Sequence, residues 1–374
     1  MKKSFNIAII GAGLAGLTAA IHLRKSGFNV LLFEKEHYPK HKVCGEYLSN
    51  EILPFWNYLG VDPFQWGAVA IDNLALSAVN GNSLDIKLPL GGFGISRYQL
   101  DHHLLEYALS LGCTLIDKTV ENVHFAENTF SISTKDQQEF KAHLVIGAFG
   151  KRSNLDFKLD RNFTNSKNNW LAVKAHYAGE IRSDQVSLHN FKGGYCGISR
   201  VEDHKINVCY LTRTEAFKPF KNIETFQQQV LCENPNLNDF FAHAQPLFDQ
   251  PISISQIAFK PKPSVEDHML MCGDSARLIH PLCGNGMAMA VISAKLASEC
   301  ICEYANQDWS RSELEQHYEW LWKRTFTNRL RAGNLLQRAL QNDSLTSTGI
   351  QVLKHLPKVT QKLIQTTHGK PLKI

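Results

Sequence analysis

Three closely spaced glycines, Gly11, Gly13 and Gly16, follow an apolar segment at residues 6–10 that is typical of a buried strand. Gly11 permits a tight turn, Gly13 lets a pyrophosphate approach the backbone, and Gly16 lets the next helix pack closely on the strand. That helix, expected to extend to about Lys25, would direct its N-terminal N–H groups and positive dipole end at the anion. The spacing therefore predicts a binding site for a dinucleotide.

The acid Glu34 ends a second apolar segment, Asn29–Phe33, where a carboxylate accepts hydrogen bonds from the hydroxyls of an adenosine ribose. An acid in this place favours an unphosphorylated ribose, and hence FAD or NAD over NADP. A glycine turn without a ligand is the alternative interpretation. The ordered series of strand, turn, helix, second strand and acid argues against it, because a chance glycine motif lacks this context.

A second glycine motif lies far along the chain. A buried strand is predicted over Met269–Cys272 and delivers Asp274 at its end, and Gly284 and Gly286 then open a long helix. An aspartate at a strand end can hydrogen-bond the hydroxyls of a polyol chain, and a helix N-terminus presents N–H groups and a dipole to an electron-rich ring edge. Both needs are those of a flavin.

Other residues outside the two glycine motifs are candidates for chemistry. Cys44 lies in a loop after the first motif, where its thiol would stand beside a cofactor; a buried cysteine before a turn glycine is the alternative. Arg97 precedes a predicted helix and would contact a cofactor phosphate or carboxylate, with a surface ion pair as the alternative. His189 and His280 are acid–base candidates, although a lone histidine more often has a structural role.

Residues 160–255 alternate between apolar and polar types in several short segments, which predicts antiparallel strands with one solvated face. A helix is expected over 218–233. The stretch Gly193–Gly197 interrupts the alternation and indicates a close backbone approach. The apolar face of such a sheet suits an apolar small-molecule substrate.

The composition is that of an ordinary globular protein, with 44% hydrophobic and 20% charged residues, and 374 residues exceed the usual size of a single core. No uncharged apolar run has the length of a transmembrane helix, and two lysines precede the first strand, so we expect a cytoplasmic protein. The nine cysteines form no Cys-x-x-Cys pair and no zinc-like spacing with histidine. We therefore expect no metal site.

The C-terminal part of the chain is basic, since residues 323–374 hold ten lysines and arginines against one acid, Asp343. Such a segment would attract an anionic membrane surface peripherally, or a phosphorylated substrate. A solvated helical face is the alternative. We expect no nucleic-acid partner, and the oligomeric state stays open.

Four motifs together carry a family resemblance: GAGLAG with Glu34, Arg97 before a helix, VIGAFGKRS, and GDSARLIHPLCGNG. Over residues 1 to about 305 the chain resembles the flavoprotein group that includes para-hydroxybenzoate hydroxylase and the geranylgeranyl reductases. The segment that begins at Cys44 is most similar to the reductases. The hydroxylases usually carry Asp-Gly where this chain has Phe149-Gly150, which leaves NAD(P)H as the electron donor uncertain.

The resemblance implies FAD as the cofactor. It would hold the pyrophosphate at the first glycine motif, the adenosine ribose at Glu34, the ribityl chain at Asp274 and the pyrimidine edge at residues 284–286. The predicted cofactor-binding residues are Gly11, Gly13, Ala15, Gly16, Glu34, Lys35, Arg97, Asp274, Pro281, Gly284, Asn285, Gly286 and Met287. The predicted catalytic residues are Cys44 and Tyr195.

We predict an α/β fold with a Rossmann-like FAD-binding domain of the glutathione-reductase type, a mostly antiparallel β-sheet substrate domain and a C-terminal helical segment. The FAD-binding domain would comprise 1–72, 97–158 and 256–305. The substrate domain would comprise 73–96 and 159–255, and the C-terminal basic segment 306–374.

Three functions agree with these motifs. In the favoured one, reduced FAD transfers hydride to a carbon–carbon double bond of an apolar molecule, and Cys44, Tyr195 or a water supplies the proton. In the second, a monooxygenase hydroxylates an aromatic or polyketide-like ring through a flavin C4a-hydroperoxide. The third is a flavin-binding module without turnover. The Cys44 segment favours the reductase, whereas the glycine motifs serve all three.

Overall fold

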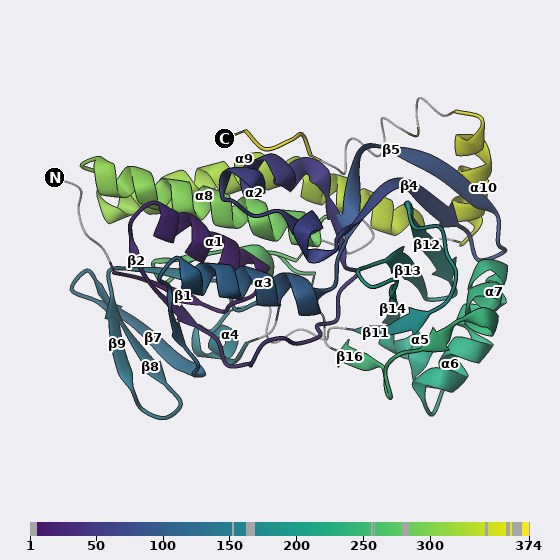
Figure 1. Cartoon of the computed structure of the whole chain (residues 1–374), viewed down its shortest axis with the longest axis horizontal. Coiled ribbons are helices and arrows are strands. Elements are labelled where there is room, and N and C mark those ends of the chain that lie inside the picture. Colours follow the sequence, from purple (N-terminus) through teal and green to yellow (C-terminus); the bar gives the residue numbers. More distant parts are fainter. Residues whose placement is uncertain are drawn as a thin grey trace.

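A computed structural model describes residues 6–151, 153–161, 169–255, 257, 259–278, 284–340, 343–356, 360 and 369–373, with the backbone alone at 336–340 and 343–345. Within these residues the strands form three sheets, and the two larger sheets lie at opposite ends of an elongated molecule (Figure 1). None of the described helices is long and apolar enough to cross a membrane.

The first sheet has the strand order β17-β18-β10-β1-β2-β6, and all its neighbours are parallel except β17 and β18. Its strands are apolar runs because helices and loops cover both faces of a parallel sheet. The strands are β1 (Asn6–Ile10), β2 (Asn29–Phe33), β6 (Thr114–Ile116), β10 (Leu144–Gly147), β17 (Val265–Glu266) and β18 (Met269–Met271).

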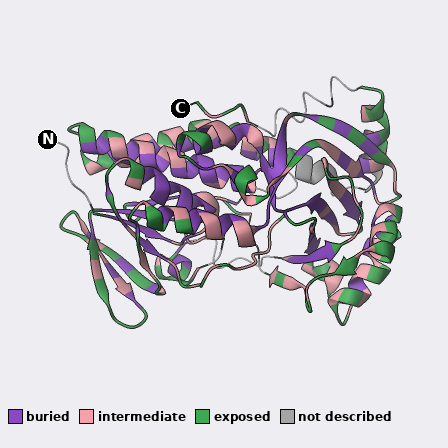
Figure 2. Ribbon diagram, in the orientation of Figure 1, coloured by how far each residue is buried: buried purple, intermediate pink, exposed green. Residues whose placement is uncertain are grey.

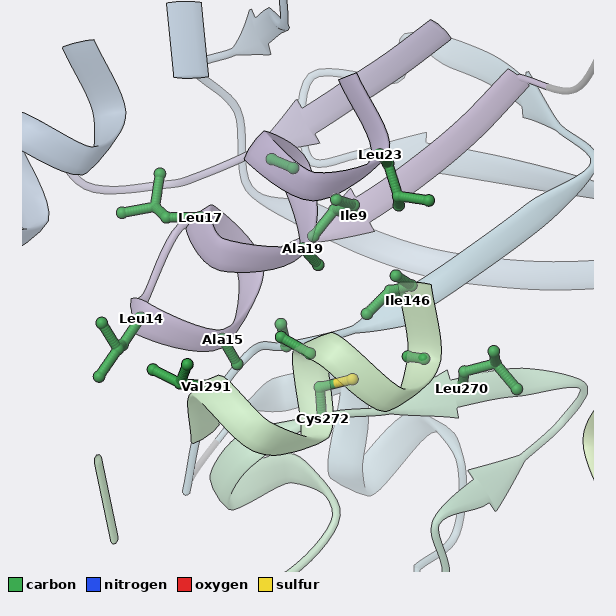
Figure 3. Packing of buried hydrophobic residues seen from close by; sticks show 14 of the residues in the cluster. Ile9, Leu14, Ala15, Leu17, Ala19, Leu23, Ile146, Leu270, Cys272 and Val291 are labelled. Carbon is green, nitrogen blue, oxygen red and sulfur yellow. The ribbon is translucent and has the colours of Figure 1, made fainter. Parts of the chain in front are cut away.

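Long helices pack beside this sheet, namely α1 (Leu14–Lys25), α3 (Arg97–Ser110), α8 (Gly286–Asn306) and α9 (Arg311–Leu340). Every residue of α1 from Leu14 to Leu23 is buried, because strands lie on one side of it and α3 and α8 on the others. Figure 3 shows Ile9 and Ile146 of the sheet facing α1, with Val291 of α8 next to Ala15. This cluster is the core of the nucleotide-binding half.

Two glycines of the first motif make this packing possible. Gly11 has φ +103°, and a side chain there would overlap the backbone of Ala148 on the next strand. A side chain at Gly16 would overlap the carbonyl oxygen of Gly11. The turn and the helix can therefore meet only because both residues lack a Cβ atom.

The second sheet is mostly antiparallel, with the order β15-β11-β14-β13-β12-β4-β5-β3 and with β16 paired to β11. Its one parallel pair within the described residues is β12 with β4. The strands are β3 (Tyr47–Ser49), β4 (Val69–Ser77), β5 (Ser83–Gly94), β11 (Trp170–Ala178), β12 (Gln185–Phe191), β13 (Gly194–Arg200), β14 (Ile206–Arg213), β15 (Gln245–Pro246) and β16 (Ile252–Ser255).

Short helices cover this sheet, as Figure 1 shows. Three of them, α5 (Thr214–Phe217), α6 (Ile223–Gln229) and α7 (Pro235–His243), lie on its outer side, and α10 (Asp343–Lys354) lies beside β4 and β5. Figure 2 shows these outer helices largely exposed, in contrast to the buried α1. The third sheet consists of β7 (Val120–Ala126), β8 (Thr129–Thr134) and β9 (Glu139–Ala142). The other described elements are the short helices α2 (Leu53–Tyr58) and α4 (Asn154–Lys158) and four 3-10 turns at Asn50–Ile52, Pro63–Trp66, Leu231–Glu233 and Gly273–Ser275.

The predicted fold class is confirmed, and the predicted domain boundaries stay predictions. One local prediction was wrong: the expected helix over 218–233 is broken, because Asn222 caps a new helix by accepting a hydrogen bond from the Thr225 N–H. The close backbone approach predicted at Gly193–Gly197 is confirmed, since a side chain at Gly194 would overlap the backbone of β14, although Gly194–Gly197 belong to strand β13 and do not interrupt it.

Gly16→Ala should lower the free energy of unfolding by about 1–3 kcal/mol, because the turn or the helix must shift to admit the methyl group. Thermal unfolding measures the effect. The matched control is Gly349→Ala in α10, where a Cβ atom would meet no heavy atom within 4 Å. The control should keep or slightly raise the wild-type midpoint, and a wild-type midpoint for Gly16→Ala would contradict the close approach.

Candidate functional site

One cavity of about 900 Å³ lies between the two larger sheets and brings together most of the predicted site residues. Gly16 and Asn285 are buried and do not contribute to its wall, and Pro281 and His280 lie outside the described residues. The predicted residues in the wall are Gly11, Gly13, Ala15, Glu34, Lys35, Cys44, Arg97, Tyr195, Asp274, Gly284, Gly286 and Met287. Their individual roles stay predictions.

The glycine turn presents the N-terminus of α1 to this cavity. Gly13 is the N-cap residue, and no side chain caps the first turn of α1 in the described structure. Among the described residues, and apart from the chain neighbours of Gly13, the only atom within 4 Å of a Cβ placed on Gly13 is Nη2 of Arg97, at 3.8 Å. An anion at this turn would therefore meet free backbone N–H groups, the positive end of a helix and a guanidinium.

Glu34 follows the second strand, β2, and its carboxylate bonds to the glycine turn. Its Oε2 accepts the Ala12 N–H at 2.8 Å, and its Oε1 accepts the N–H groups of Lys35 at 3.0 Å and Glu36 at 3.1 Å. These bonds hold the carboxylate beside the glycine turn, at the place predicted for a ribose contact.

Arg97 forms an ion pair in the interior rather than at the surface, and its predicted cofactor contact stays a prediction. Its Nε and Nη2 donate to the two carboxylate oxygens of Asp101 at 2.7 and 2.6 Å, and Lys42 Nζ donates to the same carboxylate at 2.9 Å. Asp101 is fully buried. Burial acts to lower the pKa of Arg97, but the Asp101 carboxylate outweighs it and raises that pKa. Asp101 was not predicted as a site residue, because the residues after Arg97 were interpreted only as a helix.

The second glycine motif lies next to the first, since a Cβ atom on Gly273 would be 3.2 Å from Cβ of Ala15. Asp274 follows β18 in a turn fixed by a hydrogen bond from Gly273 N–H to Ser293 Oγ at 2.8 Å, and Lys262 Nζ donates to the Asp274 carbonyl at 2.9 Å. Gly284 has φ +61°, and Gly286 begins α8, so the N-terminus of this helix borders the cavity as well.

Cys44 lies beside the start of α8 in the second motif. Its Sγ is 3.4 Å from Sδ of Met287 in the first turn of α8. Asn207 of β14 fixes the loop that carries Cys44, since its Nδ2 donates to the carbonyls of Cys44 at 3.3 Å and Gly45 at 2.9 Å. The thiol is therefore held in the cavity wall beside the helix that is predicted to face the flavin ring.

The next acid, Glu46, anchors this loop to the second sheet. Its side chain is fully buried and is bonded to Lys174 Nζ and to His176 Nε2, the latter at 2.8 Å, and it also accepts the Arg97 N–H at 2.7 Å. Burial acts to raise the pKa of Glu46, but Lys174 and His176 outweigh it and hold that pKa below its usual value. We call Glu46, Lys174 and His176 the buried charge cluster.

This cluster corrects the prediction of one solvated sheet face. In β11, Val173, Ala175 and Tyr177 pack against the outer helices, while Lys174 and His176 point to the other side and are also buried. The alternation was read correctly, but it separates an apolar buried face from a polar buried face. The alternation of a lysine and a histidine along the predicted strand was the available signal. The local sequence does not show which acid pairs with these two side chains.

Two histidines near this region have ordinary structural surroundings. His41 lies in the cavity wall with ring contacts to Tyr98 and Phe248 at 4.6 Å, and burial, aided by Lys174, lowers its pKa to about 4. His189 bonds to Ser77 at 2.8 Å, and burial lowers its pKa to about 4. Both rings are therefore neutral near pH 7, and His189 is not part of the cavity wall.

The rest of the cavity is apolar. Tyr195 lies on the inner side of β13 in a cluster with Leu211, Ile257 and Leu278. Further along, the wall consists of aliphatic side chains from β4, β5, β12 and α10, namely Leu74, Leu76, Leu84, Ile86, Leu88, Val186, Ile350 and Leu353. The cavity therefore joins a polar, glycine-rich end to an apolar end.

The residues at the polar end fit FAD. The turn at Gly11 leaves no room for a side chain and its helix N-terminus has no side-chain cap, as a backbone cradle for a pyrophosphate requires. Two such helix ends and two acids, Glu34 and Asp274, border one cavity. Among the described residues, no group of three or more His, Cys, Asp or Glu side chains is arranged to hold a metal ion.

Comparison with known proteins agrees with this geometry. Residues 9–40 match the model of the NAD(P)-binding Rossmann-like domain. Conditioned medium factor receptor 1 of Dictyostelium discoideum is 25% identical, covering 86% of this chain and 68% of the relative. Digeranylgeranylglycerophospholipid reductase of Methanosarcina acetivorans is 27% identical, covering 87% of this chain and 82% of the relative.

A monooxygenase and a halogenase are also similar. Kynurenine 3-monooxygenase of Flavobacterium psychrophilum is 26% identical, covering 84% of this chain and 77% of the relative. The solved structure of the flavin-dependent brominase Bmp2 shares the fold with a TM-score of 0.78 and 18% identity, covering 97% of this chain and 94% of that one. The predicted resemblance is confirmed: the chain is similar to flavoprotein reductases and monooxygenases, and it shares the fold of flavin-dependent enzymes.

Proposed function

We propose that the chain is an FAD-dependent reductase that adds hydrogen across a carbon–carbon double bond of an apolar, long-chain molecule. The observation that carries the proposal is the single cavity that joins the glycine turn at Gly11 to the aliphatic wall of β4, β5 and α10. The archaeal relatives named digeranylgeranylglycerophospholipid reductase support the reductase reaction over other flavin chemistry.

Bound, reduced FAD would supply the hydride. The chain's own residues would bind and orient it: the backbone at Gly11 and Gly13 would hold the pyrophosphate, and Glu34 the ribose. Arg97, fixed by Asp101, keeps a positive charge next to Gly13. The N-terminus of α8 at Gly286 would stabilise negative charge on the ring.

Reduction of a double bond requires a proton on the carbon that does not receive the hydride. We assign the proton to the thiol of Cys44, because the bonds from Asn207 hold its loop in the cavity wall beside α8. Tyr195, deeper in the apolar part of the wall, is the alternative donor. The aliphatic wall would exclude water and hold the substrate chain.

A flavin monooxygenase is the second candidate, and the similarity to kynurenine 3-monooxygenase favours it. It would use the same cofactor-binding residues, so the cofactor end of the cavity does not distinguish the two reactions. The aliphatic wall suits an alkyl or isoprenoid chain better than the polar aromatic amino acid named for that relative, since its far end carries few polar groups.

We also propose a cytoplasmic location and a peripheral contact with anionic membranes. The eight cysteines that the structure describes are all free thiols, as in a reducing compartment. On the basic C-terminal segment, Leu335, Val352 and Leu356 are 71%, 51% and 44% exposed. Exposed apolar side chains among lysines and arginines suit the surface of an anionic bilayer.

The reductase should turn over without oxygen. When the FAD-loaded protein is reduced with dithionite and mixed anaerobically with a polyunsaturated isoprenoid lipid, the oxidised flavin absorbance should return and the lipid should gain two hydrogen atoms per event, as measured by mass spectrometry. A monooxygenase would need oxygen and would add an oxygen atom instead. As the matched variant, Cys44→Ala should keep its FAD and slow this reaction about 10²–10⁴-fold. Unchanged turnover would leave Cys44 a packing residue.

Glu46→Gln should lower the free energy of unfolding at neutral pH by about 3–5 kcal/mol, because Lys174 would keep a buried charge without a counter-charge. The pKa of Glu46 is lower in the folded protein than in the unfolded chain. Its stabilisation is therefore present above the unfolded-state pKa and is lost as the pH falls through the folded-state pKa. Urea denaturation at several pH values over that acidic range should show that the difference in free energy of unfolding between the wild type and Glu46→Gln becomes smaller as the pH falls.

The added change Lys174→Met should recover most of the loss in Glu46→Gln, since it removes the unpaired charge. Wild-type stability of the single variant at neutral pH would contradict the buried charge cluster.

The membrane contact should depend on salt. The protein should sediment with vesicles that contain anionic phospholipid at low ionic strength, remain in solution with vesicles of phosphatidylcholine alone, and be released from the anionic vesicles as salt is raised. Failure to sediment with anionic vesicles at low salt would end this proposal.

A further inference from the structure

The far end of the cavity is closed by helix α10, a segment that lies beside β4 and β5 and far from the nucleotide-binding sheet (Figure 1). Ile350 of α10 is 2% exposed and packs with Leu84, Ile86 and Val186. Asn80 Nδ2, in the turn between β4 and β5, donates to Ser347 Oγ at 3.1 Å. The helix is thus seated on the sheet by both apolar contacts and a hydrogen bond.

The C-terminal end of this helix is also fixed. Thr360 is 3% exposed, and its Oγ1 donates to the carbonyls of Leu353 and Leu356, both at 3.1 Å. Thr360 and Leu353 both belong to the cavity wall. The wall at this end is therefore a packed part of the molecule.

One position in this wall is unfilled. Gly349 lies in the interior of α10 and in the cavity wall, yet a Cβ atom placed on it would meet no heavy atom within 4 Å among the described residues outside the helix's own backbone. Three glycines in the sheets are the opposite case: at Gly92, Gly94 and Gly194, a Cβ atom would overlap neighbouring backbone. Close packing therefore explains those glycines and does not explain Gly349, which disfavours the helix by about 1 kcal/mol relative to alanine.

The surroundings of this gap are hydrocarbon. Around it lie Ile350 and Leu353 of α10 and Leu84, Ile86 and Leu88 of β5, with the hydroxyl-bearing Thr346 and Thr360 at the margin. No lysine, arginine, aspartate or glutamate of the described residues lines this end. A ligand that reaches it must end in an alkyl or isoprenoid chain, because a charged terminus would find no partner there.

We infer that α10 is the end wall of the substrate channel and that Gly349 sets the length of apolar chain that the channel accepts. The inference rests on the proposed function and gives its substrate a tail-first orientation, with the chain terminus at Gly349 and the double bond nearer Cys44. A larger residue at 349 shortens the channel and leaves the cofactor end, which the two glycine motifs form, unchanged.

The test compares the affinities for alkanols of increasing chain length and needs no turnover. Purified protein with its bound flavin is titrated with straight-chain 1-alkanols of increasing length, and binding is read by displacement of Nile red. In the wild type, affinity should rise about fourfold for each added methylene until the channel is full. In Gly349→Leu the plateau should come a few methylenes earlier, and in Gly349→Ala it should lie between the two.

The matched control is Gln351→Leu, which adds the same side chain at an exposed position of the same helix. It should keep the wild-type plateau, and all four proteins should retain equal flavin absorbance and similar thermal midpoints. Equal plateaus in wild type and Gly349→Leu, or an equal shift in Gln351→Leu, would overturn the inference. So would a wild type that binds no alkanol.

The two proposals fail separately. In one case the affinity plateau shifts to shorter alkanols as expected, but the reduced protein transfers no hydrogen to an unsaturated lipid without oxygen. The proposal that Gly349 sets the channel length is then kept, and the proposed reductase function is rejected. If the lipid is reduced but Gly349→Leu accepts every length that the wild type accepts, the reductase stands and the end wall lies elsewhere.

Discussion

The buried carboxylate of Glu46 is the constraint on which the shape of the site depends. A carboxylate with no exposure to water is tolerated only where charged and polar donors surround it. Lys174 and His176 come from the second sheet, and the Arg97 N–H comes from the start of α3 beside the first sheet. The backbone at Glu46 has φ +53°, a conformation that a non-glycine residue keeps only when its surroundings fix it. The loop that carries Cys44 is therefore held by both halves of the molecule.

A second buried carboxylate, Asp101, extends this arrangement towards the cofactor. It fixes Arg97 and Lys42, while Tyr38 accepts from Lys42 and donates to the Ala12 carbonyl in the glycine turn, each at 2.6 Å. The two acids and the cations Arg97, Lys42 and Lys174 thus form a band of charged groups across the junction of the sheets. On one side of this band the cavity has backbone donors, as a dinucleotide needs. On the other side it is aliphatic, so one cavity can take two ligands of opposite character.

Local patterns were sufficient for the nucleotide-binding half of the fold. Strands at residues 6–10 and 29–33, helix α1 and the opening of α8 at Gly286 follow from apolar runs and glycine spacing, since each rule acts over a few neighbouring residues. The buried charge cluster could not be predicted in this way, because Glu46 and Lys174 are 128 residues apart and neither pattern shows a partner. The alternation in β11 predicted the two faces correctly, but it did not show that the polar face is buried. The basic tail was likewise predicted as a separate helical segment, and its part in the cavity depends on long-range packing.

The C-terminal segment reaches both the start of α2 and the apolar end of the cavity. Arg329 of α9 donates to both oxygens of the buried Glu51 at 3.0 and 2.8 Å, and the Leu372 N–H donates to the Glu51 carbonyl at 2.8 Å. These bonds fasten the segment next to the start of α2, while α10 reaches the apolar end of the cavity. We therefore expect changes in α10 to alter the apolar end of the cavity without disturbing the glycine turns, which are built from other parts of the chain. The cofactor end is constrained by backbone packing at Gly11 and Gly16, whereas side chains of α10 help to close the apolar end, so the two ends can change independently.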